Sequence, residues 1–418
     1  MLALAVIGAL AGILIFRAAP RVALVSWTVV LFFAPIWVGF SVSHFYSAIT
    51  LVTLICIASA STRGLRFSRV DAALLLFAAL ITGSFLLGGV TLGHLLIALL
   101  DWLVPYAFGR VILARIGIEF ITVTIAVVTV AAAAFALVEF ATHVNIFVLV
   151  HWDNSGYLQW SPLQTRGGFL RAEGAFGHSI ALGAALAIGS VFILSCRWKL
   201  GVRIAALAIV GGATVVTFSR IGLLSFALGM VLSIAFLTGL LTLRARAVIA
   251  ALSVVGALIA LPFITEVFSA AGQEAQGSAN YRFDLTSLIS QMPPLGLSSS
   301  YQVLPNGDVY IGNFQSIDSA LILIGLRFGY IPLAILLGLL VAALVLMFRS
   351  RANAPLIALM AQIPTFATVD LITQLPYLIW FIAGLAVSLY ILNNKRVRAE
   401  EIVDVRAKIL RPERTLHG

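Results

Sequence analysis

Residues that can bind anions and move protons stand close together in the stretch LRAEGAFGHS, residues 170 to 179. Arg171, Gly174 and His178 are spaced i, i+3 and i+7, so a helix there would place all three on one face. Glu173 adds a carboxylate, and Gly174 would let a ligand approach closely. The stretch therefore predicts an anion-binding or proton-transfer site. The alternative is an interfacial loop whose arginine and histidine meet water or lipid headgroups.

A second charged pair lies in NFQSIDSALILIGLRFGYIPLAILLGLL, residues 313 to 340. We expect Asp318 to open a membrane span at the water boundary, and Arg327, nine residues later, to lie about 14 Å deeper. A charge inside a span is costly and marks a functional site by default. Gly325 and Gly329 predict close helix packing around it. Asp370 could partner Arg327, and a purely structural ion pair between them is the alternative.

Two further arginines stand beside groups that would help them hold an anion. Arg220 follows Thr217 and Ser219, and their hydroxyls together with the guanidinium would form an anion seat. Arg282 lies two residues before Asp284, so both a local ion pair and anion binding fit this spacing.

The elements that must position these residues are membrane helices. The chain has 418 residues, of which 61% are hydrophobic and 10% are charged, and its mean hydropathy is +1.10. Apolar runs of roughly 17 to 25 residues, each long enough to cross a bilayer as a helix, recur about thirteen times. We predict an all-α bundle of about 12 to 13 transmembrane helices over residues 1 to 394, followed by a basic tail from 395 to 418. Cys56 and Cys196 lie in or beside apolar runs and predict no disulfide framework.

The basic residues fall in alternate loops, a pattern that predicts the orientation of the chain. By the positive-inside rule these loops and the C-terminus are cytoplasmic, and an odd number of spans places Met1 outside. The net charge of +10 therefore reflects topology, and we expect the tail to contact anionic lipids rather than nucleic acid. The residues are Arg17, Arg21, Arg63, Arg66, Arg69, Arg110, Arg115, Arg197, Lys199, Arg203, Arg244, Arg246, Arg349 and Arg351.

The opposite face keeps five basic residues, and all five are arginines. Arginine without lysine favours bidentate binding of phosphate or carboxylate, although ordinary loop arginines are the alternative. They are Arg166, Arg171, Arg220, Arg282 and Arg327.

Two connections on this face are long enough to hold structure, at about 141 to 176 and about 267 to 317. The first contains Trp152, Tyr157 and Trp160 among amides and carboxylates, which suits sugar rings but also suits a membrane-interface belt. The second predicts a short helix from about 280 to 291, ended by two prolines, and then a turn at LPNGDVY.

The sequence contains no pattern for a bound nucleotide or metal. Its six histidines are scattered without ligand spacing, and no Walker loop, GxSxG or dinucleotide fingerprint appears in the required context. We therefore expect no cofactor, and a donor that is already activated by its leaving group.

Residues 165 to 345 resemble the O-antigen ligase and O-antigen polymerase superfamily of bacterial membrane glycosyltransferases. RAEGAFGH is similar to that family's R-x-x-G-x-F-x-H, and FSRIGLL to its S-R-G/S segment. YRFDLTSLISQMPPLGLSS resembles its arginine helix ending in P-x-x-G-x-G, and IDSALILIGLRFG its H/D-N-x-Y-L-x-x-L-x-E-x-G segment. Four weak motifs in this order and on one side of the membrane are together moderately specific.

The chain departs from the family pattern at several positions. Ser298 replaces the second loop glycine, Ser319 replaces the asparagine, and the aromatic after Arg282 is displaced or missing. Ligases of the family carry histidine where Asp318 stands, and glutamate is frequent where Arg327 stands. Asp318 therefore favours a polymerase or exopolysaccharide branch over a lipid A-core ligase.

The resemblance implies a glycosyltransferase-C-like fold and metal-independent, inverting transfer of a polyprenyl-diphosphate-linked glycan. The reaction would occur on the periplasmic face of the bacterial inner membrane, with a glycan or lipid A-core as acceptor. Arg171, Arg220, Arg282 and Arg327 would bind the pyrophosphate. Asp318 would act as the base, with Glu173 as the second candidate. His178, Trp152 and Trp160 would contact acceptor or sugar.

Two other classes of protein remain as alternatives. A transporter of lipid-linked glycans or small anions would more often show two similar halves, and no such repeat is visible in the sequence. A scaffold for an exopolysaccharide complex would tolerate loss of the outer arginines.

Overall fold

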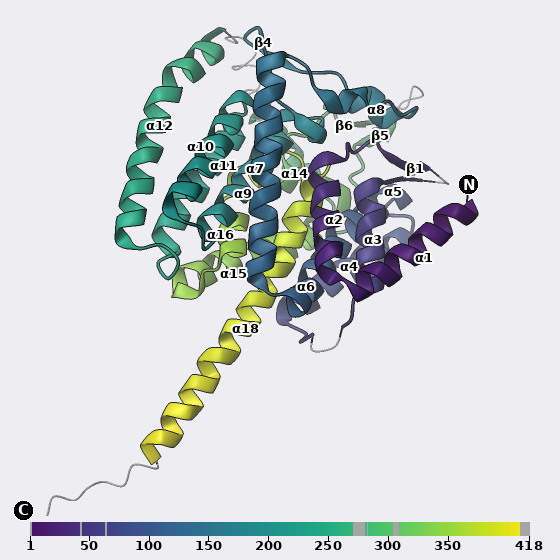
Figure 1. The fold of residues 1–418 in the computed structure, drawn as a ribbon. Coiled ribbons are helices and arrows are strands. Elements are labelled where there is room, and N and C mark those ends of the chain that lie inside the picture. The colour runs from purple at the N-terminus through teal and green to yellow at the C-terminus, as the bar shows by residue number, and fades with distance from the viewer. Residues whose placement is uncertain are drawn as a thin grey trace, which may run out of the picture.

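The computed structural model describes residues 2 to 41, 44 to 62, 65 to 270, 281, 283 to 303 and 309 to 409. Helices account for most of these residues (Figure 1). The strands among them form three separate antiparallel hairpins of two strands each. The chain is therefore almost entirely α-helical, as its apolar runs predict.

The helices fall into three groups along the chain. Those before the first long loop are α1 (Leu2–Ala18), α2 (Pro20–Phe33), α3 (Ala48–Ser59), α4 (Arg69–Leu86), α5 (Leu92–Leu96), the π-helix η1 (Ile97–Leu103), α6 (Val104–Ile116) and α7 (Ile118–Thr142). The next are the 3-10 helix η2 (Ile146–Leu149), α8 (Ser155–Trp160), the 3-10 helix η3 (Gly174–Phe176), α9 (Ser179–Ser195), α10 (Leu200–Val216), α11 (Arg220–Phe236) and α12 (Leu243–Ala270). The last are the 3-10 helix η4 (Leu285–Gln291), α14 (Ala320–Phe328), α15 (Tyr330–Leu346), the π-helix η5 (Met347–Arg351), α16 (Ala354–Met360), α17 (Ile363–Thr368) and α18 (Leu375–Ile409). The paired strands are β1 (Gly39–Ser41) with β2 (Phe45–Ser47), β3 (Thr165–Arg166) with β4 (Phe169–Leu170), and β5 (Tyr301–Val303) with β6 (Val309–Ile311).

Within the described ranges, six helices are long and apolar enough to cross a membrane. They are Arg69–Leu86, Leu92–Ile116, Ile118–Thr142, Leu243–Ser269, Tyr330–Arg349 and Leu375–Asn394. The shorter apolar helices are Ile7–Ala18, Pro20–Phe33, Ala48–Ser59, Ser179–Ser195, Leu200–Val216, Arg220–Phe236 and Ala354–Thr368. The helices at α12 and α15 bury little of their apolar surface, which suits contact with lipid. This architecture is that of a helical membrane protein.

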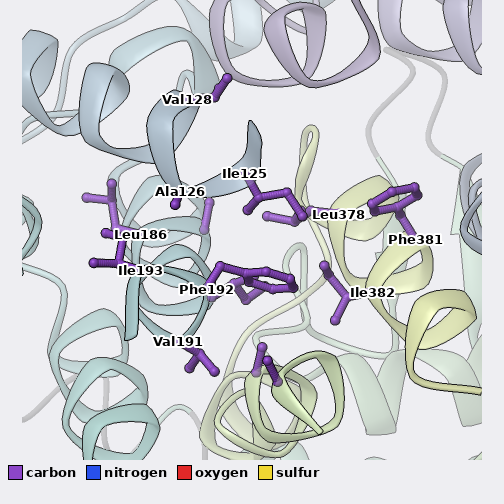
Figure 2. Packing of buried hydrophobic residues seen from close by; sticks show 14 of the residues in the cluster. Ile125, Ala126, Val128, Leu186, Val191, Phe192, Ile193, Leu378, Phe381 and Ile382 are labelled. Carbon is purple, nitrogen blue, oxygen red and sulfur yellow. The ribbon is translucent and has the colours of Figure 1, made fainter. Parts of the chain in front are cut away.

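Helix α9 occupies the middle of the bundle because it is apolar on all sides. Each of its residues except Ile180 is buried, and α7, α10, α11 and α16 pack around it. Small residues allow this approach: a Cβ on Gly189 would overlap the Thr129 side chain of α7, and a Cβ on Gly183 would lie 3.2 Å from the Cα of Gly222. Figure 2 shows aliphatic and aromatic side chains of α7, α9 and α18 that meet in this core.

Helices α6 and α18 cross closely at two glycines, and a hydrogen bond from Arg110 joins them beside this crossing. A Cβ on Gly109 or on Gly384 would overlap the facing backbone. Arg110, which the sequence pattern places in a loop, lies within α6 and is 5% exposed. Its guanidinium reaches Asp71 at 2.9 Å and donates to the Ser388 hydroxyl at 2.7 Å, so it ties α4, α6 and α18 together.

The predicted continuous span beginning near Asp318 is broken at Gly329. The short helix α14 ends there, and α15 begins at Tyr330 in a new direction. Gly329 has φ +97°, and a Cβ would lie 2.6 Å from the Cα of Leu295. Tyr330 then donates its N–H to the Pro293 carbonyl at 2.8 Å. Gly329 therefore packs closely against the loop at Pro294 and Leu295 and not against another helix, and Arg327 ends a separate helix instead of lying deep in a long one.

The second long loop contains less regular helix than the sequence predicts. The described 3-10 helix η4 runs from Leu285 to Gln291 and ends before the prolines, while Asn280 lies outside the described residues. The first five residues of LPNGDVY, 304 to 308, also lie outside them. On either side, β5 and β6 pair as an antiparallel hairpin.

Helix α18 continues without a break past residue 394, where the sequence pattern predicts the start of the tail. Figure 1 shows its C-terminal part extending away from the bundle. Residues 410 to 418 lie outside the described part of the chain.

Candidate active-site cavity

A polar cavity of about 850 Å³ opens among helix ends at one side of the bundle. Its walls come from five parts of the chain. They are residue 36 with residues 44 to 50, the α5 to η1 helix, residues 159 to 180, residue 301 with residues 309 to 327, and residues 368 to 377. We call this space the polar cavity.

Arg17 and Arg115, two of the basic loop residues, lie at the far end of α3 from the polar cavity. Thr50, near the start of α3, lines the polar cavity, whereas Ser59 at the end of α3 accepts a hydrogen bond from Arg115 at 3.4 Å. The same guanidinium donates to the Arg17 carbonyl at the end of α1 at 2.6 Å. The polar cavity is therefore separated from these two residues by the length of α3.

Four of the residues predicted from the sequence line this one cavity. They are Trp160, His178, Asp318 and Arg327, and the predicted partner Asp370 joins them. They come from two loops and from α14, so the structure brings together segments that are far apart in the chain.

Arg327 stands in the last turn of α14 and is half-buried in the cavity wall. Across the described part of the chain, its guanidinium has no hydrogen-bond or ion-pair partner. The nearby carbonyls of Leu326 and Phe328 are occupied by the N–H groups of Ser298 and Gly296. A permanently charged group that faces a cavity and has no acceptor among the described residues is suited to binding an anion.

Two carboxylates share the electrostatic environment of Arg327. Burial raises the pKa of Asp370, and the nearby positive charge of Arg327 opposes this rise. The Asp370 carboxylate accepts the N–H of Leu371 at 2.7 Å, while Asp318 accepts the Ser316 hydroxyl at 3.0 Å. The predicted Arg327 to Asp370 ion pair is absent among the described residues, although the charges act on one another.

His178 caps the N-terminus of α9. Its Nδ1 accepts the N–H of Ile180 at 3.2 Å, and its ring lies edge-on to Trp160 at 6.0 Å between centroids. Burial lowers the pKa of His178 to about 4, and the positive charges of Arg171 and Arg166 contribute to this lowering. The ring is therefore neutral at pH 7, and its Nε2–H remains available as a donor.

Arg171 and Glu173 are buried and do not line the cavity. Arg171 donates to the Thr217 carbonyl and to the Gln164 side chain, both at 3.1 Å, and Gln164 forms part of the cavity wall. The Glu173 carboxylate accepts the N–H of Gln164 at 3.2 Å. Burial raises the pKa of Glu173 to about 8. These two residues thus support the cavity wall from behind.

The helical face predicted for residues 171 to 178 does not form. The chain there passes from β4 through η3 to the cap of α9, and Gly174 and Gly177 have φ values of +55° and +60°. These left-handed turns interrupt the i, i+3, i+7 arrangement. Of the predicted set, His178 reaches the cavity.

Glu139 of α7, which sequence reasoning missed, holds this loop. Its two carboxylate oxygens accept the N–H groups of Glu173 at 3.1 Å and Gly174 at 2.9 Å, and the Asn145 amide at 2.8 Å. Glu139 could have been noticed in the sequence, because it is an acidic residue near the end of an apolar run.

The remaining predicted residues lie elsewhere. Arg220 is exposed and stacks over Phe268 at 4.3 Å, while the hydroxyls of Thr217 and Ser219 are engaged in local hydrogen bonds. Trp152 is 41% exposed and is not part of the cavity lining. Arg282 lies outside the described residues.

The cavity also contains functional groups that sequence reasoning did not single out. His94 and Asp101 line it from the α5 to η1 helix, and Tyr377 lines it from the start of α18. Asp101 was detectable as an acidic residue inside an apolar run. Tyr377 could not be singled out in this way, because a tyrosine near a helix end is also typical of a membrane interface.

An apolar cavity of about 450 Å³ adjoins the polar one between α4, α14, α15, α16 and α18. Leu371 lines both, and Trp102 on the polar side stacks on Trp380 on the apolar side at 5.8 Å. A ligand with a charged head and a long apolar tail would match this pair of spaces.

The described residues contain no group of three His, Cys, Asp or Glu side chains that could hold a metal ion. The cavity is thus lined by the guanidinium of Arg327, several carboxylates, the neutral imidazole of His178 and aromatic rings. Comparison with protein-family models, with curated proteins and with solved structures finds no match to this chain.

Proposed function

We propose that the protein is a membrane glycosyltransferase of the O-antigen or exopolysaccharide polymerase type. In this proposal the polar cavity binds a glycan linked to a polyprenyl diphosphate and transfers it to a hydroxyl of an acceptor glycan. A lipid A-core acceptor, as in an O-antigen ligase, would use the same chemistry.

The observation that carries the proposal is Arg327. It lies, without a hydrogen-bond partner among the described residues, in a cavity of about 850 Å³ that Trp160 and His178 also line. A diphosphate offers a planar guanidinium the bidentate oxygens that it prefers, and charge develops on that group as the glycosyl bond breaks. The aromatic rings and the neutral His178 would contact sugars.

The adjoining apolar cavity would receive the first part of the polyprenyl tail. It lies beside α15, whose surface is largely exposed and which would face lipid. A carrier could then enter from the bilayer while its diphosphate stays in the polar cavity.

Membrane topology supports an outer-face reaction. Six helices are long and apolar enough to cross a membrane, and in the proposed topology the seven shorter apolar helices cross it as well, with the basic loops and the tail after α18 in the cytoplasm. The polar cavity would then open on the periplasmic side of a bacterial inner membrane, where lipid-linked glycans are joined.

The test is binding of a fluorescent short-chain polyprenyl-diphosphate-linked glycan to the purified full chain in nanodiscs. Loss of one charged hydrogen-bonding group costs about 1.5 to 3 kcal/mol, so Arg327→Ala should weaken binding roughly 10- to 150-fold. The affinity of Arg327→Lys should lie between those of wild type and Arg327→Ala, because lysine keeps the positive charge but cannot make the bidentate hydrogen bonds of a guanidinium.

The matched control is Arg197→Ala, which removes an equal charge from an exposed position on the basic-loop side. It should bind the donor like the wild type and should give glycans of normal length. A folded Arg327→Ala protein that binds within about twofold of wild type would contradict the proposal.

A transporter of lipid-linked glycans is the second candidate, because broken helices surround the polar cavity. The helix carrying η1, the short helix α14 and the non-helical stretch between α17 and α18 all contribute to it. Discontinuous helices of this kind form substrate sites in transporters. Reconstitution separates the two functions: movement of a labelled lipid-linked glycan across a liposome bilayer without a change in length would favour transport.

A further inference from the structure

Asp101 lies where a membrane-spanning helix is locally widened into the π-helical turn η1. The cause is visible in the sequence: Pro105 has no N–H to donate to the Asp101 carbonyl four residues earlier, and its ring disfavours a regular α-turn. Val104 instead donates to Leu99, five residues back. Such π-turns in α-helices occur frequently at functional sites.

A chain of hydroxyl groups ends on this carboxylate. Tyr377 donates its phenol O–H to Asp101 Oδ1. The Thr50 hydroxyl lies 2.6 Å from the Tyr377 oxygen and must be the donor there, because the phenol proton is already used. Ser47 in turn lies 2.8 Å from Thr50 and donates to it. All four side chains line the polar cavity, and each hydrogen bond points toward Asp101.

The second oxygen of Asp101 is available to a ligand. Oδ2 makes no hydrogen bond to any residue in the described ranges, and the side chain is half-buried in the cavity wall. An ionised carboxylate can only accept hydrogen bonds, so the fitting partner is a hydroxyl donor. A sugar hydroxyl has that chemistry.

The other carboxylates of the cavity have different surroundings. Arg327 acts on Asp370, which also accepts the N–H of Leu371, while Asp318 accepts the hydroxyl of Ser316. Asp101 is held by hydroxyl groups, not by a guanidinium.

We propose that Asp101 is the catalytic base, which accepts the proton of the acceptor hydroxyl, and that Tyr377 is a positioning residue for it. This inference rests on the proposed glycosyl transfer. The acceptor oxygen forms a bond to the anomeric carbon of the donor sugar while the bond from that carbon to the phosphate oxygen breaks. The hydroxyl proton passes to Asp101 Oδ2, and the lipid diphosphate leaves with the bonding electron pair.

The experiment compares Asp101→Asn with Asp153→Asn, an exposed aspartate of the outer loop. A general base contributes about 10²- to 10⁴-fold, so Asp101→Asn should lower turnover by that factor while donor binding stays within about threefold. Asp153→Asn should keep normal turnover. Tyr377→Phe should lower turnover roughly tenfold, and the exposed Tyr330→Phe should not.

Formate supplies the readout that a structural role would not produce. It should restore part of the turnover of Asp101→Ala but none of that of Arg327→Ala, because only the first variant lacks a proton acceptor. Absence of rescue, full turnover by Asp101→Asn, or equal loss of donor binding and turnover would each overturn the assignment to Asp101. A wild-type chain that transfers no glycan would overturn the proposed function together with it.

Discussion

An oxygen of the Glu139 carboxylate accepts a 2.9 Å hydrogen bond from the main-chain N–H of Gly174. The other oxygen accepts the N–H of Glu173 at 3.1 Å and the amide of Asn145 at 2.8 Å. All three partners are donors, and Glu139 itself is buried. This carboxylate therefore anchors to α7 the loop that carries Trp160 and His178 into the polar cavity.

Glu139→Gln should destabilise the protein by about 1 to 3 kcal/mol, because one end of the new amide is a donor facing another donor. Thermal unfolding in detergent would show the loss of stability. Binding of the lipid-linked glycan should also weaken, because the loop that carries Trp160 and His178 becomes less ordered. Glu119→Gln is the control, since the Glu119 side chain is 69% exposed and its ion pair with the exposed Arg197 is long, at 4.0 Å. A Glu139→Gln protein as stable as Glu119→Gln would contradict the anchoring role.

The contribution of Glu173 to the free energy of unfolding should decrease as the pH rises. Its pKa is about 8 in the folded chain against an ordinary value of 4.5, so between these values the folded state binds more protons than the unfolded state. The contribution is complete below the lower value and is lost as pH rises through the upper one. Unfolding temperatures measured from about pH 5 to about pH 9 should fall less for Glu173→Gln than for wild type.

The Glu173→Gln variant also separates support from catalysis. A neutral amide resembles the protonated acid, so a folded variant should keep donor binding and turnover at neutral pH. Complete loss of turnover by a stable Glu173→Gln protein would instead show that the ionised carboxylate takes part in the reaction.

Gly329→Ala should cost more than most single substitutions. The new Cβ would lie 2.6 Å from the Leu295 Cα and 2.7 Å from the Pro294 carbonyl oxygen, at a φ of +97°. Strain of this kind costs on the order of 1 to 3 kcal/mol and would shift α14, which carries Arg327.

Gly338→Ala, in the open middle of α15, provides the matched control. No atom lies within 4 Å of its added Cβ, so this variant should be neutral or stabilised by up to about 1 kcal/mol. Thermal unfolding and donor binding measured on both variants check the comparison, and equal behaviour of the two would rule out strain at Gly329.

Much of the fold could be predicted from local sequence. Hydropathy is a property of each apolar run by itself, so the helices at α7, α12 and α15 were apparent without tertiary information. Trp160, His178, Asp318 and Arg327 were recognisable for a similar reason: polar groups are costly in an apolar chain and need a purpose or a partner.

The break at Gly329 and the turns at Gly174 and Gly177 could not be read in the same way. Gly329 looked like a packing glycine inside one long apolar run, and its positive φ depends on Pro294 and Leu295 more than thirty residues earlier. Glycine permits such conformations, but the surrounding contacts select them.

The sequence by itself determined a helical membrane protein with arginines, carboxylates and aromatic residues in its two long loops, because composition and hydropathy act locally. Only the tertiary structure decided which of these groups share one cavity. It turned Arg171 and Glu173 into buried supports, moved Arg220 to the surface, and joined Tyr377 to Asp101 across 276 residues. The physical reason is that helix packing brings distant segments together through close contacts of small residues, and no local pattern records which helices become neighbours.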